Sequence, residues 1–129
     1  MPQSMSILKG SLVILLPFLV FDLEDSSTYN NIDFNSFDLI FMLASSMNGI
    51  QSKTMESSPF DLNCNAYKNL LNYFVEINFS KHFVYISSMT VYSVDNTSPV
   101  EENGNTELPP NPYGLSKLFA EKLTKFYCR

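Results

Sequence analysis

Three side chains in the last third of the chain have the types and the order needed to take a proton from an alcohol. Tyr113 and Lys117 are four residues apart, so on a helix they would share one face. A tyrosine is a weak base near neutral pH because its ordinary pKa is about 10, and a neighbouring ammonium stabilises the phenolate form. Ser88, with Ser87 before it, could hydrogen-bond the substrate oxygen as charge develops on it. The trio suits removal of a proton from an alcohol whose carbon gives up hydride.

A strand and a helix are predicted to position this trio. Residues 83–87 (FVYIS) are rich in aromatic and β-branched types, which predicts a strand ending at the two serines. Asn111 and Pro112 predict the cap and the first position of a helix, with Tyr113 in its first turn. The buried stripe of that helix is predicted to be Leu115, Leu118, Phe119, Leu123 and Phe126.

Further upstream, strand and helix patterns alternate. Residues 17–22 predict a short apolar strand, with Pro17 at its start. Residues 38–44 (DLIFMLA) predict a strand buried on both faces. Ser58 and Pro59 predict a helix start, after which apolar residues recur at helical spacing: Phe60, Cys64, Tyr67, Leu70, Leu71, Phe74 and Ile77. This order predicts an α/β fold with a doubly wound parallel sheet, whose carboxyl edge, near the long loop 91–111, would hold a ligand site.

In these motifs the chain resembles the extended short-chain dehydrogenase/reductase family, in particular its NAD-dependent nucleotide-sugar epimerases and dehydratases. The resemblance runs from about residue 17 to the C-terminus and implies a Rossmann-like fold. It rests on Ser-Ser-x-x-Val-Tyr at residues 87–92 and Pro-Tyr-Gly-x-Ser-Lys at residues 112–117, followed by Ala120-Glu121. Three more segments are similar to family motifs: Asp22-Leu23-x-Asp25, Met42-Leu43-Ala44-Ser45, and Asn63-Cys64-Asn65-Ala66-Tyr67-x-Asn69-Leu70-Leu71.

The resemblance implies roles for individual residues. Ser88 takes the catalytic Ser/Thr position, Tyr113 that of the base, and Lys117 that of the residue bridging to the nicotinamide ribose. The implied contacts to NAD or NADP are Asp22, Leu23, Leu43, Ala44, Ser45, Tyr113 and Lys117. The implied substrate is a nucleotide sugar, and the implied assembly is a possible homodimer.

The chain also departs from the family pattern. Family members begin with a strand and a glycine-rich turn that holds the pyrophosphate. None of the four glycines of this chain forms such a turn, and residues 1–16 match no family segment. We therefore expect residues 17–129 to be part of a Rossmann-like domain, without the first βαβ unit and the C-terminal substrate domain. The pair Ala66-Tyr67 replaces a small Gly-Thr pair, which predicts altered packing there.

Composition excludes several other classes of protein. Eight basic and 13 acidic residues give a formal charge of −5, which argues against a nucleic-acid-binding surface. Two cysteines and one histidine are too few for a typical zinc site, and idle thiols fit a reducing, cytoplasmic location. The apolar run 12–21 is too short to cross a membrane, although a signal peptide is an alternative to a buried strand.

Several functions remain open at this point. The first is a sugar-nucleotide epimerase or dehydratase whose site is carried here in an incomplete domain. The second is a cofactor-free remnant or interaction module of the same fold, and the third is an alcohol (hydroxysteroid- or flavonoid-type) dehydrogenase. A secreted, non-enzymatic domain is the alternative that a signal peptide would imply.

Four expectations concern the structure and the activity of the chain. The Tyr113 hydroxyl should lie near Ser88 Oγ, and Asp22 should be accessible to solvent at the sheet edge. The chain alone should bind NAD weakly or not at all and turn over no nucleotide sugar, since it lacks the glycine turn. The missing βαβ unit should also leave one face and one edge of the sheet uncovered, which favours self-association.

Overall fold

A computed structural model of the protein describes residues 7–8, 11–12, 19–47, 59–97 and 99–128. Its helices are α1 (Tyr67–Glu76) and α2 (Pro112–Tyr127), and its strands are β1 (Ile7–Leu8), β2 (Ser11–Leu12), β3 (Leu39–Met42) and β4 (His82–Tyr85). Shorter helical turns are η1 (Ser26–Asn31), η2 (Phe34–Ser36) and η4 (Met89–Val91), which are 3-10 turns, and η3 (Asp61–Ala66), a π-helical turn that leads into α1.

The central sheet consists of β3 and β4, which pair in parallel. Leu39 lies opposite His82 and Met42 opposite Tyr85. Two hydrogen bonds extend the ladder beyond the strands, from His82 N to Asp38 O and from Ile86 N to Met42 O, both 3.2 Å. Separately, β1 and β2 form an antiparallel pair. The parallel pair with an intervening helix confirms the predicted α/β class.

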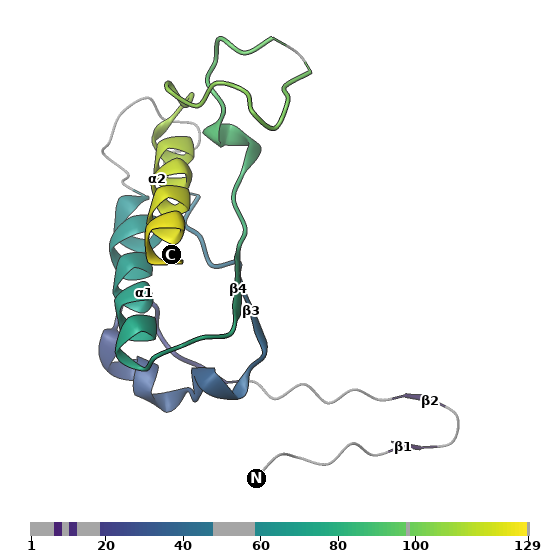
Figure 1. The fold of residues 1–129 in the computed structure, drawn as a ribbon, viewed down its shortest axis with the longest axis vertical. Coiled ribbons are helices and arrows are strands. Elements are labelled where there is room, and N and C mark those ends of the chain that lie inside the picture. The colour runs from purple at the N-terminus through teal and green to yellow at the C-terminus, as the bar shows by residue number, and fades with distance from the viewer. Residues whose placement is uncertain (1–6, 9–10, 13–18, 48–58, 98, 129) are drawn as a thin grey trace.

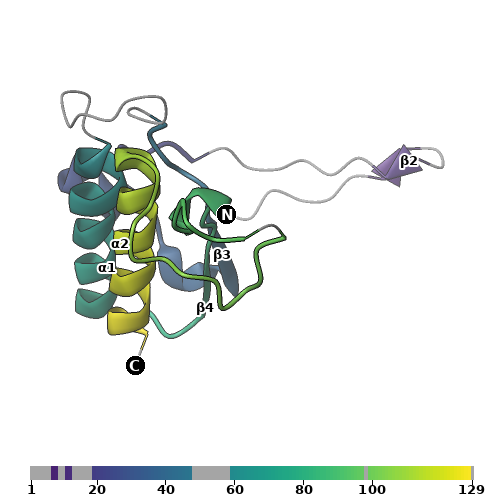
Figure 2. The same ribbon diagram turned by 90° about the horizontal axis from the view of Figure 1, so that it is seen from above.

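Both helices lie on one side of the β3–β4 sheet (Figures 1 and 2). Side chains alternate along each strand, so Ile40 and Met42 of β3 and Phe83 and Tyr85 of β4 pack toward the helices. Residues between them point to the other side, and Phe41 is 55 % exposed. The prediction that residues 38–44 are buried on both faces was therefore wrong. The pattern of residue types gives the strand, but burial depends on what covers each face, and only one face is covered by described elements.

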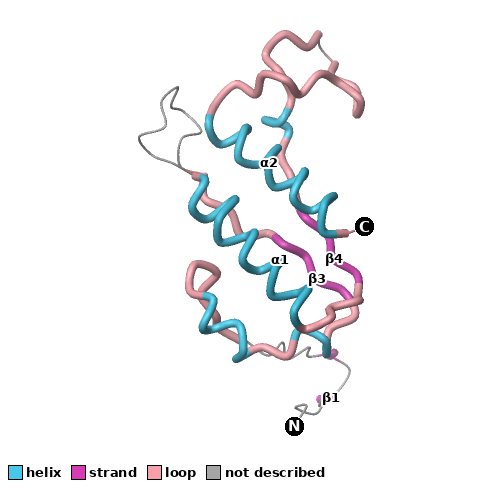
Figure 3. Tube along the Cα trace, turned by 60° about the vertical axis from the view of Figure 1, so that its left-hand side comes forward, coloured by secondary structure: helices cyan, strands magenta, loops and turns pink. Residues whose placement is uncertain are grey.

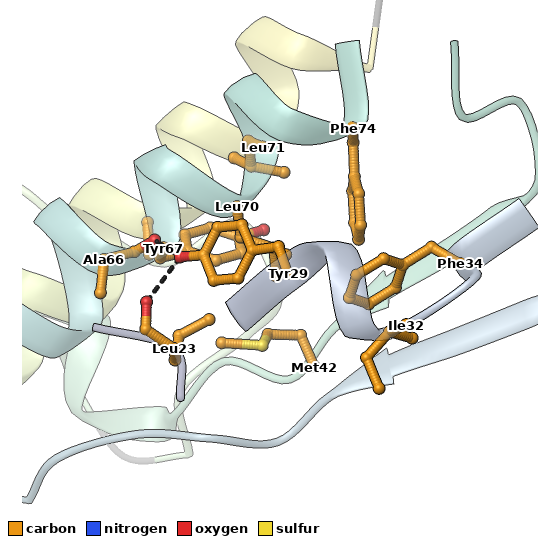
Figure 4. Packing of buried hydrophobic residues seen from close by; sticks show 11 residues of the cluster. Leu23, Tyr29, Ile32, Phe34, Met42, Ala66, Tyr67, Leu70, Leu71 and Phe74 are labelled. Carbon is orange, nitrogen blue, oxygen red and sulfur yellow. Dashed lines mark hydrogen bonds between the residues drawn. The ribbon is translucent and has the colours of Figure 1, made fainter. Parts of the chain in front are cut away.

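The apolar core lies between the sheet, α1 and the two turns η1 and η2 (Figure 4). Tyr29 of η1 is fully buried, and its hydroxyl donates to Leu23 O at 2.5 Å. Phe34 of η2 packs edge-on against Phe74 of α1 with ring centroids 5.1 Å apart. The segment between residues 22 and 37 thus covers one end of the core between the sheet and α1.

The strand predicted over residues 17–22 is not present at its described positions. Residues 19–22 form no ladder, and Leu19 and Val20 are 55 % and 87 % exposed. Pro17 lies outside the described residues, as does the predicted cap Ser58. A strand needs a partner for its backbone hydrogen bonds, and no described strand lies beside residues 19–22.

The helix predicted after Pro59 is confirmed, with two features that the periodicity did not indicate. It begins as the π-helical turn η3, and it ends at Glu76, with Ile77 as its cap before Asn78, whose φ of 51° is left-handed. Tyr67 fits without difficulty: it is fully buried, its ring lies 5.0 Å from that of Tyr85, and its hydroxyl lies 2.7 Å from Thr124 Oγ1. The tyrosine therefore fills the space between α1, β4 and α2.

Candidate functional site

The first turn of α2 is fixed by its cap, as the sequence predicts. Asn111 has extended backbone angles, and its side chain accepts a hydrogen bond from Gly114 N at 2.8 Å. Pro112 occupies the first helical position, where a missing N–H costs nothing. Tyr113 follows in this turn and Lys117 one turn later, and both are buried, with exposures of 8 % and 2 %.

The buried stripe predicted for this helix was wrong, since Leu115, Phe119 and Phe126 are exposed. The face that packs inward instead carries Tyr113, Ser116, Lys117 and Ala120, because the polar side chains among them find partners inside the protein.

This turn is pressed against the segment that follows β4. A Cβ atom added at Gly114 would lie 2.1 Å from Thr90 O and 3.0 Å from Thr90 C, so no larger residue fits without movement of the backbone. Thr90 belongs to η4, which Ser88 caps by accepting a hydrogen bond from Thr90 N at 3.3 Å. Ser88 Oγ also lies 2.9 Å from Thr90 Oγ1. Glycine at position 114 thus brings the helix of Tyr113 and Lys117 onto the turn that carries Ser88.

Lys117 reaches back to the end of β4. Its Nζ donates a hydrogen bond to Ile86 O at 2.6 Å and lies 4.3 Å from the centre of the Tyr85 ring. Burial lowers the pKa of the Lys117 ammonium from its ordinary value, an effect that the nearby Glu121 carboxylate partly opposes. An ammonium has three donors, and only one is used among the described residues. Two N–H groups thus remain for a ligand.

The Tyr113 side chain is buried without joining the apolar cluster of the core. Its hydroxyl makes no hydrogen bond with any described residue. The predicted short distance between the Tyr113 hydroxyl and Ser88 Oγ stays a prediction.

A buried polar network ties the loop after β3 to the same helix. Asn63 of η3, 3 % exposed, accepts hydrogen bonds from Ser45 Oγ at 3.2 Å and Ser46 N at 2.7 Å. Its Nδ2 donates to Ser46 O and to Ser116 Oγ, both at 2.9 Å. Ser116, fully buried, donates in turn to Tyr113 O at 2.7 Å. One amide therefore connects Ser45, predicted to contact the cofactor, with the turn that carries Tyr113.

The other predicted cofactor contacts lie in two segments, residues 22–23 before η1 and residues 43–45 after β3. Asp22 is exposed, as expected, and its Oδ1 accepts from Glu24 N at 2.9 Å, which leaves the rest of the carboxylate open to solvent. The Leu23 side chain is in the core, and its carbonyl accepts a hydrogen bond from the Tyr29 hydroxyl. Leu43 and Ala44 are exposed just beyond β3, beside Ser45. Asp22 was predicted to cap a strand, but it begins a turn, in which Asp22 O accepts from Asp25 N at 3.2 Å.

Ser87, next to Ser88, has a buried hydroxyl that makes no hydrogen bond with any described residue. It lines a hollow of about 440 Å³ between β4 and α2, together with Tyr85, Glu121 and Lys125. Sequence reasoning did not assign roles to Ser87, Asn63 or Ser116. Asn63 could have been predicted as part of a polar network, because it is an amide on the buried face of a helix, where a polar side chain must find hydrogen-bond partners.

The parallel strands, with a Tyr-x-x-x-Lys helix docked at the carboxyl end of β4, define an α/β protein of the dinucleotide-binding class. The family model described as NAD dependent epimerase/dehydratase family matches residues 5–129. The chain belongs to this family.

Solved structures agree with this fold. The structure of RMD from Pseudomonas aeruginosa complexed with NADPH is 30 % identical, with a TM-score of 0.69 over 85 % of this chain and 39 % of that one. UDP-glucose 4-epimerase from Bifidobacterium longum, in complex with NAD+ and UDP, is 26 % identical, with a TM-score of 0.68 over 84 % and 32 %. UDP-glucose 4-epimerase from Brucella ovis, in complex with NAD, is 22 % identical, with a TM-score of 0.73 over 86 % and 34 %.

This chain therefore spans between about a third and two fifths of the length of these three relatives. A search of curated proteins found no match. Among the described residues, no three potential ligands gather as a metal site, and no helix is both long and apolar enough to cross a bilayer.

Proposed function

We propose that this chain carries the proton-transfer site of an NAD(P)-dependent nucleotide-sugar epimerase or dehydratase, with Ser88, Tyr113 and Lys117 as its catalytic residues. The observation that carries the proposal is the close approach of Gly114 to Thr90, which joins the helix of Tyr113 and Lys117 to the turn capped by Ser88. An amphipathic helix that only covers a core does not require its first turn to lie this close to a neighbouring backbone.

The side chains fit the cofactor by their unused hydrogen-bonding groups. Lys117 has two donors that would bind ribose hydroxyls, and the carboxylate of Asp22 would accept from an adenine or ribose. The bound nicotinamide would supply hydride acceptance and return. Leu43, Ala44 and Ser45, with the backbone of Leu23, would line the adenosine side.

The chain's own residues would handle the proton. Tyr113 would take it from a sugar hydroxyl through its phenol oxygen, with the Lys117 ammonium stabilising the phenolate. Ser88 Oγ would hydrogen-bond the same substrate oxygen as its charge changes. The burial of Lys117 and its hydrogen bond to Ile86 O support this role, because they would hold the ammonium in one place before a ligand binds.

We also propose a cytoplasmic location and weak cofactor binding by this chain alone. Both cysteines are free, which fits the reducing environment of the cytoplasm. The 129-residue chain offers no glycine-rich turn for a pyrophosphate, and losing two or three charge-assisted bonds of about 1.5–3 kcal/mol each would weaken NAD binding by several powers of ten. We therefore expect millimolar binding and no sugar turnover by this chain alone.

Titration of the isotopically labelled chain with NAD, followed by NMR amide shifts, tests the proposal at such affinities. With NAD at roughly 1–10 mM, shifts should concentrate at residues 22–23, 43–45, 86–88 and 113–117. Lys117→Met should remove the shifts at 86–88 and 113–117, whereas Lys122→Met, at an exposed position of the same helix, should leave them unchanged.

Shifts that avoid residues 86–88 and 113–117, or that survive Lys117→Met, would contradict the site. An absence of any specific shift would favour the second function, a non-catalytic module of the same fold. If NAD binds as expected, adding a steroid or flavonoid alcohol in place of a UDP-sugar separates the third function from the first.

A further inference from the structure

Lys117 is a buried cation that has no counter-ion among the described residues. It is 2 % exposed, and no carboxylate in the described part of the chain forms an ion pair with it. Glu121, one turn further along α2, influences its charge without an ion pair. A buried ammonium needs compensating groups, because water no longer solvates its charge. The groups that contact Nζ therefore decide how firmly Lys117 keeps its proton.

Two groups at the end of β4 contact the ammonium. Ile86 O accepts its hydrogen bond at 2.6 Å, and Nζ lies over the Tyr85 ring, 4.3 Å from the ring centre. Tyr85 is the last residue of β4, and its side chain points toward the helices, which lie on one side of the two strands (Figure 3). The face of an aromatic ring carries negative potential, which attracts a cation within about 6 Å of its centre. The ring and the carbonyl thus offer the ammonium the negative potential that a counter-ion would supply.

The Tyr85 ring is itself held in place and uncharged. Its centre lies 5.0 Å from that of the Tyr67 ring, and Tyr67 is fully buried in α1. Burial, and to a smaller extent the nearby Tyr67 hydroxyl, raises the pKa of the Tyr85 phenol, whereas burial lowers the pKa of Lys117. The phenol of Tyr85 therefore keeps its proton over the whole range in which Lys117 titrates.

We propose that Tyr85 is a positioning residue of the proton-transfer site, which holds the Lys117 ammonium over the face of its ring and helps to keep it charged. This role rests on the proposed function, in which that ammonium stabilises the Tyr113 phenolate. The ring carries the role and the hydroxyl does not, because the cation lies over the ring face. An aliphatic side chain at position 85 would leave Nζ with the Ile86 carbonyl and an apolar wall.

An NMR titration of the full chain, with its lysines isotopically labelled at the ε-carbon, follows the loss of the Lys117 proton as the pH rises. The signal that Lys117→Met removes assigns the resonance. Tyr85→Phe keeps the ring and should leave the midpoint close to that of the wild type. Tyr85→Leu removes the ring and should shift the midpoint about one pH unit lower, a tenfold weaker hold on the proton.

Phe83→Leu is the matched control. Phe83 lies on the same side of β4, two residues before Tyr85, and its ring centre lies 5.5 Å from that of Phe74 in the core. This variant should lose stability as Tyr85→Leu does, but it should leave the midpoint of Lys117 unchanged.

The other ionisable groups around Tyr85 and Lys117 are Glu121 and Tyr113 of α2, Cys64 of η3 and Tyr67 of α1. Burial raises the pKa of both Cys64 and Tyr67 to about 12, so these two keep their protons where Lys117 titrates. Each titration is repeated in a Tyr113→Phe background, which keeps that phenol out of the measured curve. If Tyr85→Leu does not fold, phenylalanines with increasing numbers of fluorine atoms at position 85 replace it. Fluorine withdraws charge from the ring face, so the midpoint should then fall step by step.

A midpoint that stays unchanged or rises without the ring, or with a fluorinated ring, overturns the proposal. So does an equal shift by Phe83→Leu, which would assign the effect to core packing. If Tyr85→Leu lowers the midpoint but NAD shifts no amide at residues 86–88 or 113–117, the proposed function fails, and with it the positioning role of Tyr85 in the reaction. If NAD shifts those amides but the midpoint does not depend on Tyr85, the proposed function stands and the role of Tyr85 fails alone.

Discussion

Replacing Gly114 with alanine sets two opposing effects against each other. Alanine favours a helix over glycine by at most about 1 kcal/mol, so propensity alone predicts a more stable protein. The added methyl group, however, would lie 2.1 Å from Thr90 O and 3.3 Å from Pro109 Cβ. The nearest neighbour is a backbone carbonyl, which cannot move aside as a side-chain end would. Overpacking of this kind costs about 1–3 kcal/mol, and we place it at the upper end here.

The net expectation is a loss of about 2 kcal/mol in the free energy of unfolding, or roughly 5–10 °C in Tm. Urea unfolding followed by circular dichroism measures it, with Lys122→Ala as an exposed control on the same helix that should change stability by less than about 0.5 kcal/mol. A Gly114→Ala variant as stable as the wild type, or more stable, would refute the reasoning. It would mean that α2 does not press against η4.

Three other measurements probe the site and the core. Asn63→Ala breaks four hydrogen bonds and should cost about 2–4 kcal/mol in urea unfolding, whereas Ala at exposed Asn65 should cost under about 0.5. Because burial lowers the pKa of Lys117, the unfolded chain binds more protons than the folded chain between that lowered value and 10.5. Wild-type stability should therefore rise with pH in that window relative to Lys117→Met, and a flat difference would count against a buried ammonium. Burial also raises the pKa of Cys64 to about 12, so a thiol reagent at pH 8 should label only exposed Cys128 until urea is added.

Local chemistry made parts of the fold predictable. The start of α2 followed from Asn111 and Pro112, since a cap and a first-turn proline act within a few residues. The start of α1 was not predicted, because a π-helical turn at residues 61–66 precedes it and its apolar residues also recur at helical spacing. The positions of β3 and β4 were right to within one or two residues.

What the sequence could not show depended on distant neighbours. Residues 19–22 are as apolar as a strand, but without a described partner they form no ladder. Phe41 lies in a run of apolar residues typical of a strand that is buried on both faces, yet no described element covers its side of the sheet. The network centred on Asn63 joins residues 46 and 116, which are 70 positions apart in the chain (116 minus 46), so no local pattern could reveal it.

The unpaired hydroxyl of Ser87 has a consequence for how the sheet behaves. A buried hydroxyl without a partner costs about 1–3 kcal/mol, and a methyl group would avoid that cost. In the language of energy landscapes, Ser87 is a frustrated position two residues beyond the end of β4. We therefore expect the backbone just after β4 to open at a lower free energy than the middle of the strand, because opening would give that hydroxyl a water partner. Ser87 lies between Ile86, whose carbonyl accepts a hydrogen bond from Lys117, and Ser88, which caps η4, so we expect local opening at Ser87 to disturb both of these contacts.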